Sequence, residues 1–398
     1  MALRNERIKV AIIAPDKLPI PNTKGGAIET LATHWINKNE EYGDVEIIVF
    51  SPFDEKAENI SSAYKHTQVK YYSNNSSLKI FNKIWGGLYH FSKRRIIAKR
   101  GFILQISSDL RAVNPDIIIA EGSFLQVPQL AKFGKPVILH VHTDILNKLE
   151  PKCHQIVSLC RKVWTNSDYI TSQVIDGSGI PEKIKTLPNA IDTKKFLSGN
   201  GNEIRKKYNI SDDSKVMIYC GRVDPIKGVK ELVLAFEKAN IDNLILLIVG
   251  GSRFADSGIS TYEKEIHEYV STHDLKVIFT GFVYPEELPS YYKAANFSVC
   301  PSICNEAAGL VIVEARSAGL PVIATKNGGI PEYASPEGSI LIDYRHEFFI
   351  DDLANAICTM NKETSESNRL QIQSSKGVEK FDIDTYYHNF VKYLEEVL

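Results

Sequence analysis

The chain has 398 residues, and its 47 Lys+Arg and 48 Asp+Glu give a formal net charge of −1 at pH 7. The length predicts two domains at about 150 residues each. The composition is 43% hydrophobic and 24% charged, which excludes a disordered chain, a collagen-like chain and a small disulfide scaffold. No apolar run approaches the ~18 residues of a membrane span. The six cysteines show neither a C-x-x-C pair nor zinc spacing, so we expect reduced thiols and a cytoplasmic location.

Short β-branched runs alternate with amphipathic stretches of helix length along almost the whole chain. The runs are apolar on both faces, as parallel strands covered by helices are. This alternation predicts an α/β fold with doubly wound sheets of about six strands each. The predicted strands are 9–14, 45–50, 69–72, 116–120, 136–141, 163–166, 215–220, 244–249, 276–280, 297–301, 321–325 and 339–342.

The alternation pauses between Pro188 and Ser214, where turn-forming residues accumulate. We therefore place a domain junction near residue 189, which gives domains 1–188 and 189–380. The last segment, 381–398, has apolar residues at helical spacing. We expect it to form a helix that packs back on the first domain.

Two adjacent glycines, Gly25 and Gly26, follow the first predicted strand and a proline-rich loop. Adjacent glycines let backbone N–H groups approach a phosphate closely. The spacing is not G-x-G-x-x-G, which disfavours a dinucleotide cofactor. The alternative is a plain turn between a loop and a helix.

The charges are distributed unevenly, with a net +7 over residues 1–188 and −8 over the remainder. Residues 59–108 hold nine basic and no acidic side chains, interleaved with aromatic and aliphatic ones. The part from 79 to 100 is typical of a surface that lies on an anionic membrane. A solvated basic face is the alternative. Nucleic acid is not expected as a partner, because no RNA- or DNA-binding motif accompanies the charges.

Two histidines, His140 and His142, lie at the end of a predicted strand and on the same face of it. They are candidate metal ligands or core histidines, but no third ligand is evident at usable spacing. The single D-x-D motif, Asp382 to Asp384, precedes the last helix and is interpreted as a helix cap. We therefore expect no metal.

Two cations, Arg222 and Lys227, lie on one loop between a predicted strand and a helix that begins near Val229. Positive side chains beside a helix N-terminus form an anion site. Such a site suits the departure of a nucleoside diphosphate, because fixed positive charge stabilises the negative charge that grows on the phosphate oxygen. The alternative is a solvated loop.

Two glutamates, Glu306 and Glu314, are separated by seven residues. Glu306 falls at the carboxyl end of strand 297–301, where ligands bind in open α/β sheets. Glu314 interrupts an apolar helix face and needs a partner, which a polyhydroxylated ligand can supply. The alternative is a pair of capping or salt-bridged carboxylates.

This block, with the following Gly-Leu-Pro-Val-Ile-Ala-Thr and the segment from Asn327 to Glu332, resembles the E-x7-E block of retaining glycosyltransferases of family 4. The resemblance covers nearly the whole chain and is strongest from 220 to 333. It implies the GT-B fold, in which two Rossmann-like domains face each other across a cleft. The chain departs from the family pattern at Ala307-Ala308-Gly309, where the family commonly has Gly-Phe-Gly.

The resemblance also implies roles for single residues. Glu306 would meet sugar hydroxyls, Arg222 and Lys227 the diphosphate, and His142 the reacting sugar, and these four are the expected catalytic residues. The expected substrate-binding residues are Gly25, Gly26, Asn189, Gly251, Val283, Gly309, Leu310 and, at the ribose, Glu314.

The expected protein is thus a metal-independent, hexosyltransferase-like enzyme without a cofactor. It would move a sugar from a nucleotide-diphosphate sugar, for which we expect UDP, to a glycan or lipid-linked acceptor in cell-surface polysaccharide synthesis. The second domain would bind the donor and the first the acceptor, at the inner face of the membrane. The alternatives are a nucleotide-sugar epimerase of similar fold and a non-catalytic coat or assembly relative.

Overall fold

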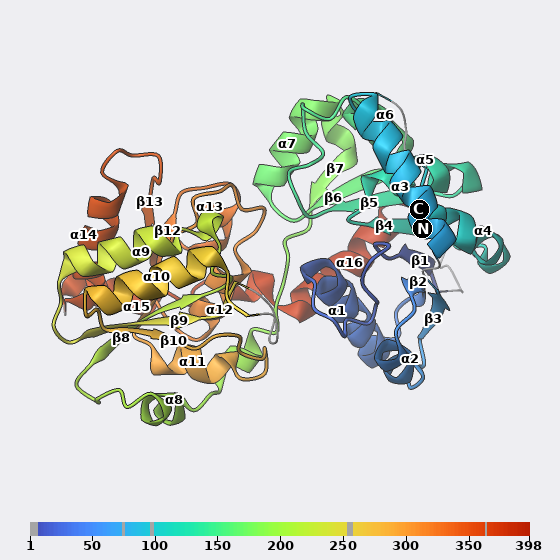
Figure 1. Ribbon diagram of the computed structural model, residues 1–398. Coiled ribbons are helices and arrows are strands. Elements are labelled where there is room, and N and C mark those ends of the chain that lie inside the picture. Colours follow the sequence, from blue (N-terminus) through green and yellow to red (C-terminus); the bar gives the residue numbers. More distant parts are fainter. Residues whose placement is uncertain (1–6, 74–75, 96–98, 253–257, 363) are drawn as a thin grey trace. The chain divides into compact units, whose positions relative to one another are not determined.

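The chain folds into two compact units, each built on one parallel sheet (Figure 1). The first unit comprises Met1–Asn189 and Ile383–Leu398, and the second comprises Ala190–Asp382. The predicted α/β class with two doubly wound sheets is confirmed. The computed structural model describes residues 7–73, 76–95, 99–252, 258–362 and 364–398.

The first sheet has the strand order β3-β2-β1-β4-β5-β6-β7, and every neighbouring pair is parallel. This is the Rossmann order, in which the direction of winding reverses between β1 and β4. The strands are β1 (Lys9–Ile13), β2 (Glu46–Pro52), β3 (Thr67–Tyr72), β4 (Ile117–Glu121), β5 (Val137–Val141), β6 (Lys162–Thr165) and β7 (Ile184–Thr186).

The edge strand β7 is missing from the sequence prediction, which gave about six strands to this sheet. It has only three residues, all half-buried, so it carries no apolar run to detect. The helices of this unit are α1 (Ala27–Tyr42), α2 (Glu55–Ser61), α3 (Ser76–Phe91), α4 (Gly101–Val113), α5 (Val127–Leu130), α6 (Cys153–Leu159), α7 (Asp168–Ser178) and α16 (Ile383–Glu395).

The second sheet repeats the Rossmann order as β10-β9-β8-β11-β12-β13, again with parallel neighbours. Its strands are β8 (Lys215–Cys220), β9 (Leu244–Val249), β10 (Val277–Phe279), β11 (Phe297–Cys300), β12 (Val322–Thr325) and β13 (Ser339–Ile342). Its helices are α8 (Gly201–Lys207), α9 (Val229–Ala239), α10 (Thr261–Thr272), α11 (Leu288–Ala294), α12 (Leu310–Ser317), α13 (Ile330–Tyr333), α14 (Phe349–Asn361) and α15 (Ser365–Gln373).

The second sheet is buried on both faces, which explains its continuous apolar runs. Alternate residues of β8 enter different cores: Met217 packs with α9 and α14, whereas Ile218 packs with α11 and α12. Successive side chains of a strand point to opposite faces, so a strand covered on both sides must be apolar throughout. None of the helices in the described ranges is long and apolar enough to cross a membrane.

The last helix, α16, packs on α1 although the two lie more than 340 residues apart in the chain. The ring of Phe390 stacks on that of Trp35 with centroids 4.3 Å apart, and Tyr386 stacks on the same indole at 5.2 Å. The hydroxyl of Tyr387 donates to Asn39 at 2.9 Å. The C-terminal helix is therefore part of the core of the first unit.

Replacing Phe390 with alanine should destabilise the first unit by about 3–5 kcal/mol, since a fully buried ring leaves a cavity. All three tryptophans of the chain, Trp35, Trp85 and Trp164, belong to this unit, so tryptophan fluorescence during urea unfolding reports on it alone. The exposed Glu395→Ala change on the same helix is the control. Equal unfolding midpoints for the two variants would contradict a structural role for α16.

Candidate functional site

The strand order of the second sheet reverses between β8 and β11, the point at which open α/β sheets bind ligands. The loop after β8 ends at Gly228, and it touches the loop after β11. Gly228 has φ +70°, and an added Cβ would lie 2.1 Å from the carbonyl oxygen of Pro301. Only glycine allows this approach, which brings the two loops that carry the predicted cations and carboxylate together.

Lys227 and Glu306 form an ion pair at this reversal point, the Nζ atom contacting Oε1 of the carboxylate. Ser302 Oγ donates to the same oxygen at 2.7 Å. The side chains of Lys227 and Glu306 are only 21% and 19% exposed. The structure thus brings together two predicted catalytic residues that lie 79 positions apart in the sequence.

Arg222 lies beside a pocket of about 300 Å³ in the same unit. The predicted binding residues Gly251 and Val283 line this pocket with it, and Phe282 and Leu288 add apolar walls. The Arg222 side chain is 60% exposed and lies 3.6 Å from Asp224. The pocket therefore combines an apolar wall with an exposed guanidinium, a combination that suits a flat ring joined to an anion.

The helix α12 carries three predicted binding residues. Gly309 is the residue before its first turn, Leu310 begins the helix and Glu314 lies one turn further. Burial raises the pKa of Glu314 to about 7, although a hydrogen bond from Tyr292 and the charge of Lys195 act in the opposite direction. The Tyr292 hydroxyl donates to Oε2 of Glu314 at 2.8 Å, so the partner that this carboxylate needs is partly supplied by the protein.

In the first unit, Gly25 and Gly26 lie in the loop between β1 and α1 with φ angles of +79° and +111°. A Cβ added to Gly26 would lie 2.2 Å from Oε2 of Glu29, whose buried side chain folds over the glycine. Burial also raises the pKa of Glu29, and the neighbouring charge of Glu121 adds to this rise.

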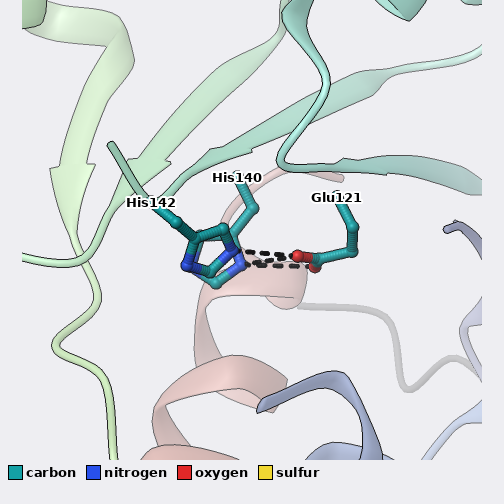
Figure 2. A group of neighbouring side chains, drawn as sticks. All are labelled: Glu121, His140 and His142. Atoms are coloured by element: carbon teal, nitrogen blue, oxygen red, sulfur yellow. Dashed lines mark hydrogen bonds and ion pairs between the residues drawn. The ribbon is translucent and has the colours of Figure 1, made fainter. Parts of the chain in front are cut away.

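His142 belongs to a buried cluster with His140 and Glu121 (Figure 2). His140 Nδ1 lies 3.2 Å from both carboxylate oxygens of Glu121, and His142 Nε2 lies 3.1 Å from Oε2. Burial raises the pKa of Glu121, but the interactions with His140 and His142 outweigh this effect and lower the pKa to about 2. Burial lowers the pKa of His142.

Sequence reasoning did not single out Glu121. It is the last residue of β4, an acidic side chain closing the apolar run Ile117–Ala120, and the sheet register places it opposite His140. The sequence does offer a signal for Glu121, because a charged residue at the end of a buried strand needs a partner and the next strand ends in histidines.

The cluster could hold a metal ion, because Glu121, His140 and His142 each offer one ligand atom and these atoms lie within 4.8 Å of one another. Histidines that ligate a metal normally donate their other N–H to an acceptor. Across the described part of the chain, the other nitrogens, His140 Nε2 and His142 Nδ1, are buried without a partner. Neither histidine therefore has the second hydrogen bond that usually orients a metal-bound ring.

The two aspartates of the D-x-D motif do not converge on one point. Asp382 accepts from the backbone and side chain of Thr193, whereas Asp384 pairs with Lys38 at 2.7 Å. Asn189 is buried, and it is the last residue of the first unit before Ala190 begins the second.

The sequence itself matches two family descriptions. Residues 44–195 match "Glycosyltransferase Family 4", and residues 200–376 match "Glycosyl transferases group 1". The chain is a GT-B glycosyltransferase of family 4.

Individual relatives are similar in sequence to this glycosyltransferase over most of its length. YtcC and Spore coat protein SA of Bacillus subtilis are each 24% identical, over 77% of this chain and over 72% and 78% of their own lengths. The crystal structure of Anabaena Alr3699/HepE in complex with UDP covers 98% of this chain and 100% of its own, with a TM-score of 0.75 and 21% identity. That likeness shows the same fold.

Proposed function

We propose that this glycosyltransferase moves a hexose from a UDP-sugar to a glycan or lipid-linked acceptor, with retention of configuration and without a metal ion. The observation that carries the proposal is the Lys227–Glu306 ion pair beside the Arg222 pocket, at the reversal point of the second sheet. We propose cell-surface polysaccharide synthesis, in the cytoplasm, as its setting.

The donor would lie along the second unit. The pocket of about 300 Å³ suits the base, Glu314 accepts from ribose hydroxyls, and Arg222 lies at the diphosphate. A diphosphate would compete with Glu306 for Lys227 and free that carboxylate to accept from the hydroxyls of the sugar. The two cations then stabilise the charge that develops on the leaving phosphate oxygen, which removes the need for a metal. The UDP complex of the similar Anabaena protein supports the choice of nucleotide.

The acceptor would be bound by the first unit, with Gly25 and Gly26 near the donor phosphates, Asn189 at the junction and His142 at the reacting sugar. Retention is proposed from the family resemblance. In that reaction the bond from the anomeric carbon to the diphosphate breaks while the acceptor oxygen bonds to the same face. The acceptor proton passes to the leaving phosphate oxygen.

Binding of UDP-glucose should strengthen about tenfold between pH 6 and pH 8, because the pKa of Glu314 is raised to about 7 and only its ionised form is a pure acceptor for ribose hydroxyls. The charge of a nucleotide-sugar diphosphate stays constant over this range, so the ligand adds no titration. Calorimetry on wild type and Glu314→Gln measures the effect. A variant that keeps the wild-type pH dependence would contradict the ribose contact.

The function is tested by screening nucleotide sugars for thermal stabilisation, followed by product analysis with and without acceptor. We expect stabilisation by a UDP-sugar, transfer only when acceptor is present, and unchanged activity in EDTA. Isomerised donor without acceptor would identify an epimerase instead. Stabilisation without any turnover would favour a coat or assembly role, as the name of Spore coat protein SA suggests for that relative.

We also propose that the first unit binds anionic membrane through α3. Ile80, Ile84 and Leu88 recur at intervals of four residues on this helix and are 60%, 56% and 45% exposed. Lys79 and Lys83 are exposed on the same helix. Such a stripe of apolar side chains flanked by cations is typical of helices that lie in a membrane interface. Residues 96–98 of the predicted membrane surface lie outside the described residues.

A further inference from the structure

The carboxylate of Glu121 has no part in the proposed donor site, yet it contacts the ring of His142 (Figure 2). We propose that Glu121 is a positioning residue that holds His140 and His142 as neutral rings whose protons face the carboxylate. His142 would then offer the lone pair of Nδ1, and act as a hydrogen-bond acceptor rather than a donor.

The hydrogen-bond geometry leads to this assignment. An ionised carboxylate only accepts, so the nitrogens that face it, His140 Nδ1 and His142 Nε2, must each carry a proton. A neutral imidazole has one proton, which leaves lone pairs on His140 Nε2 and His142 Nδ1. Both of these ring atoms are buried without a partner in the described ranges.

Aromatic packing prevents the rings from turning to other partners. His140 stacks on Trp35 with centroids 5.2 Å apart and meets Trp164 edge-on at 6.2 Å. The His140 and His142 rings lie 4.0 Å apart. The packing therefore fixes the planes of the rings, and the position of Glu121 decides which nitrogen of each ring is protonated.

Burial keeps His142 neutral. It is the largest influence on the pKa of this ring and lowers it, whereas the carboxylates of Glu121 on β4 and Glu29 on α1 raise it. The titratable groups that interact in the cluster are Glu29, Glu121, His140 and His142. Burial raises the pKa of Glu29, which limits the negative charge it adds.

The tautomer has a consequence for recognition. A ligand group that reaches Nδ1 of His142 must donate a hydrogen bond, as a hydroxyl does. A phosphate oxygen only accepts, so the lone pair on Nδ1 would repel it. This consequence rests on the proposed function, but the tautomer itself does not.

Long-range ¹H–¹⁵N spectra of the whole protein, labelled at its 10 histidines, test the tautomer directly. The His142 signals are assigned by their loss in His142→Asn. We expect at pH 7 a neutral His142 with its proton on Nε2, and a His140 with its proton on Nδ1. A proton on Nδ1 of His142, or an imidazolium, would overturn the proposal even if transfer activity is found.

Variants separate the effect of Glu121 from that of its neighbour. In Glu121→Gln the amide no longer offers an anionic acceptor, so the Nε2–H form of His142 should lose its preference. In His140→Asn, which removes the other ring and keeps Glu121, that form should persist. Unchanged His142 signals in a folded Glu121→Gln would show that the carboxylate does not select the tautomer.

The turnover of variants tests whether the tautomer matters for sugar transfer. If transfer is established, Glu121→Gln should lower kcat by about 10²-fold, as for other carboxylates that orient a catalytic or ligating histidine. The matched control is Asp352→Asn, which removes an exposed carboxylate that lies 2.6 Å from His346 on the second unit. It should leave both kcat and the His142 signals unchanged. An absence of transfer with the expected tautomer would count against the proposed function alone.

Discussion

Lys227→Ala should lower kcat for sugar transfer by about 10²- to 10³-fold, and Arg222→Ala should do the same. Both side chains would stabilise charge that develops on the leaving diphosphate, and removing one group of this kind typically has an effect of this size. Neither residue belongs to the hydrophobic core, so their loss should create no core cavity, and Arg222→Ala, at a side chain that is 60% exposed, should leave thermal stability within about 1 kcal/mol. Steady-state kinetics with a UDP-sugar and acceptor measure the change.

Lys227 also contacts Glu306, which Arg222 does not. Lys227→Ala also removes the cation that faces the carboxylate, so its effect combines two losses. Lys230→Ala, three residues further along and exposed, keeps the composition change but touches neither group. Near-normal turnover in Lys227→Ala or Arg222→Ala, with Lys230→Ala also normal, would contradict the proposed diphosphate site.

Charge reversal on α3 should weaken binding to anionic vesicles by at least about 30-fold. Each lysine near an anionic surface contributes ~1 kcal/mol, so losing Lys79 and Lys83 alone costs ~2 kcal/mol, and glutamates in their place add repulsion. Reversal at Arg94 and Arg95 would be a less clean test, because Arg94 lies 3.8 Å from the buried Glu150. Co-sedimentation of Lys79→Glu/Lys83→Glu with anionic and neutral vesicles measures the effect.

The control is Lys56→Glu/Lys132→Glu, which reverses two exposed lysines elsewhere in the same unit. It therefore has the same net charge as the Lys79→Glu/Lys83→Glu variant. It should bind nearly as wild type does. The difference should shrink at high salt, because screening limits the range of the attraction to ~8 Å at physiological ionic strength. Wild-type protein that ignores anionic vesicles at low salt would exclude the membrane surface and favour a soluble acceptor.

The α/β class and the positions of the longer strands were predictable from the sequence because they are local properties. A strand buried on both faces needs an unbroken apolar run, and the runs at β1 and β8 are visible without any knowledge of their neighbours. The short edge strand β7 was missed, because three half-buried residues carry no such pattern. The E-x7-E spacing of Glu306 and Glu314 is likewise local, and so is the loop that carries Arg222 and Lys227.

The partners of these residues were decided only by the tertiary structure. The ion pair of Lys227 with Glu306 spans 79 positions, and the contact of Glu121 with His140 depends on the register of two neighbouring strands. The packing of α16 on α1 brings together segments that lie more than 340 residues apart in the chain. Sequence by itself determined which residues could do chemistry and which segments formed elements. Which side chains meet, and therefore which are charged, paired or held in one tautomer, followed from strand order and packing between distant segments.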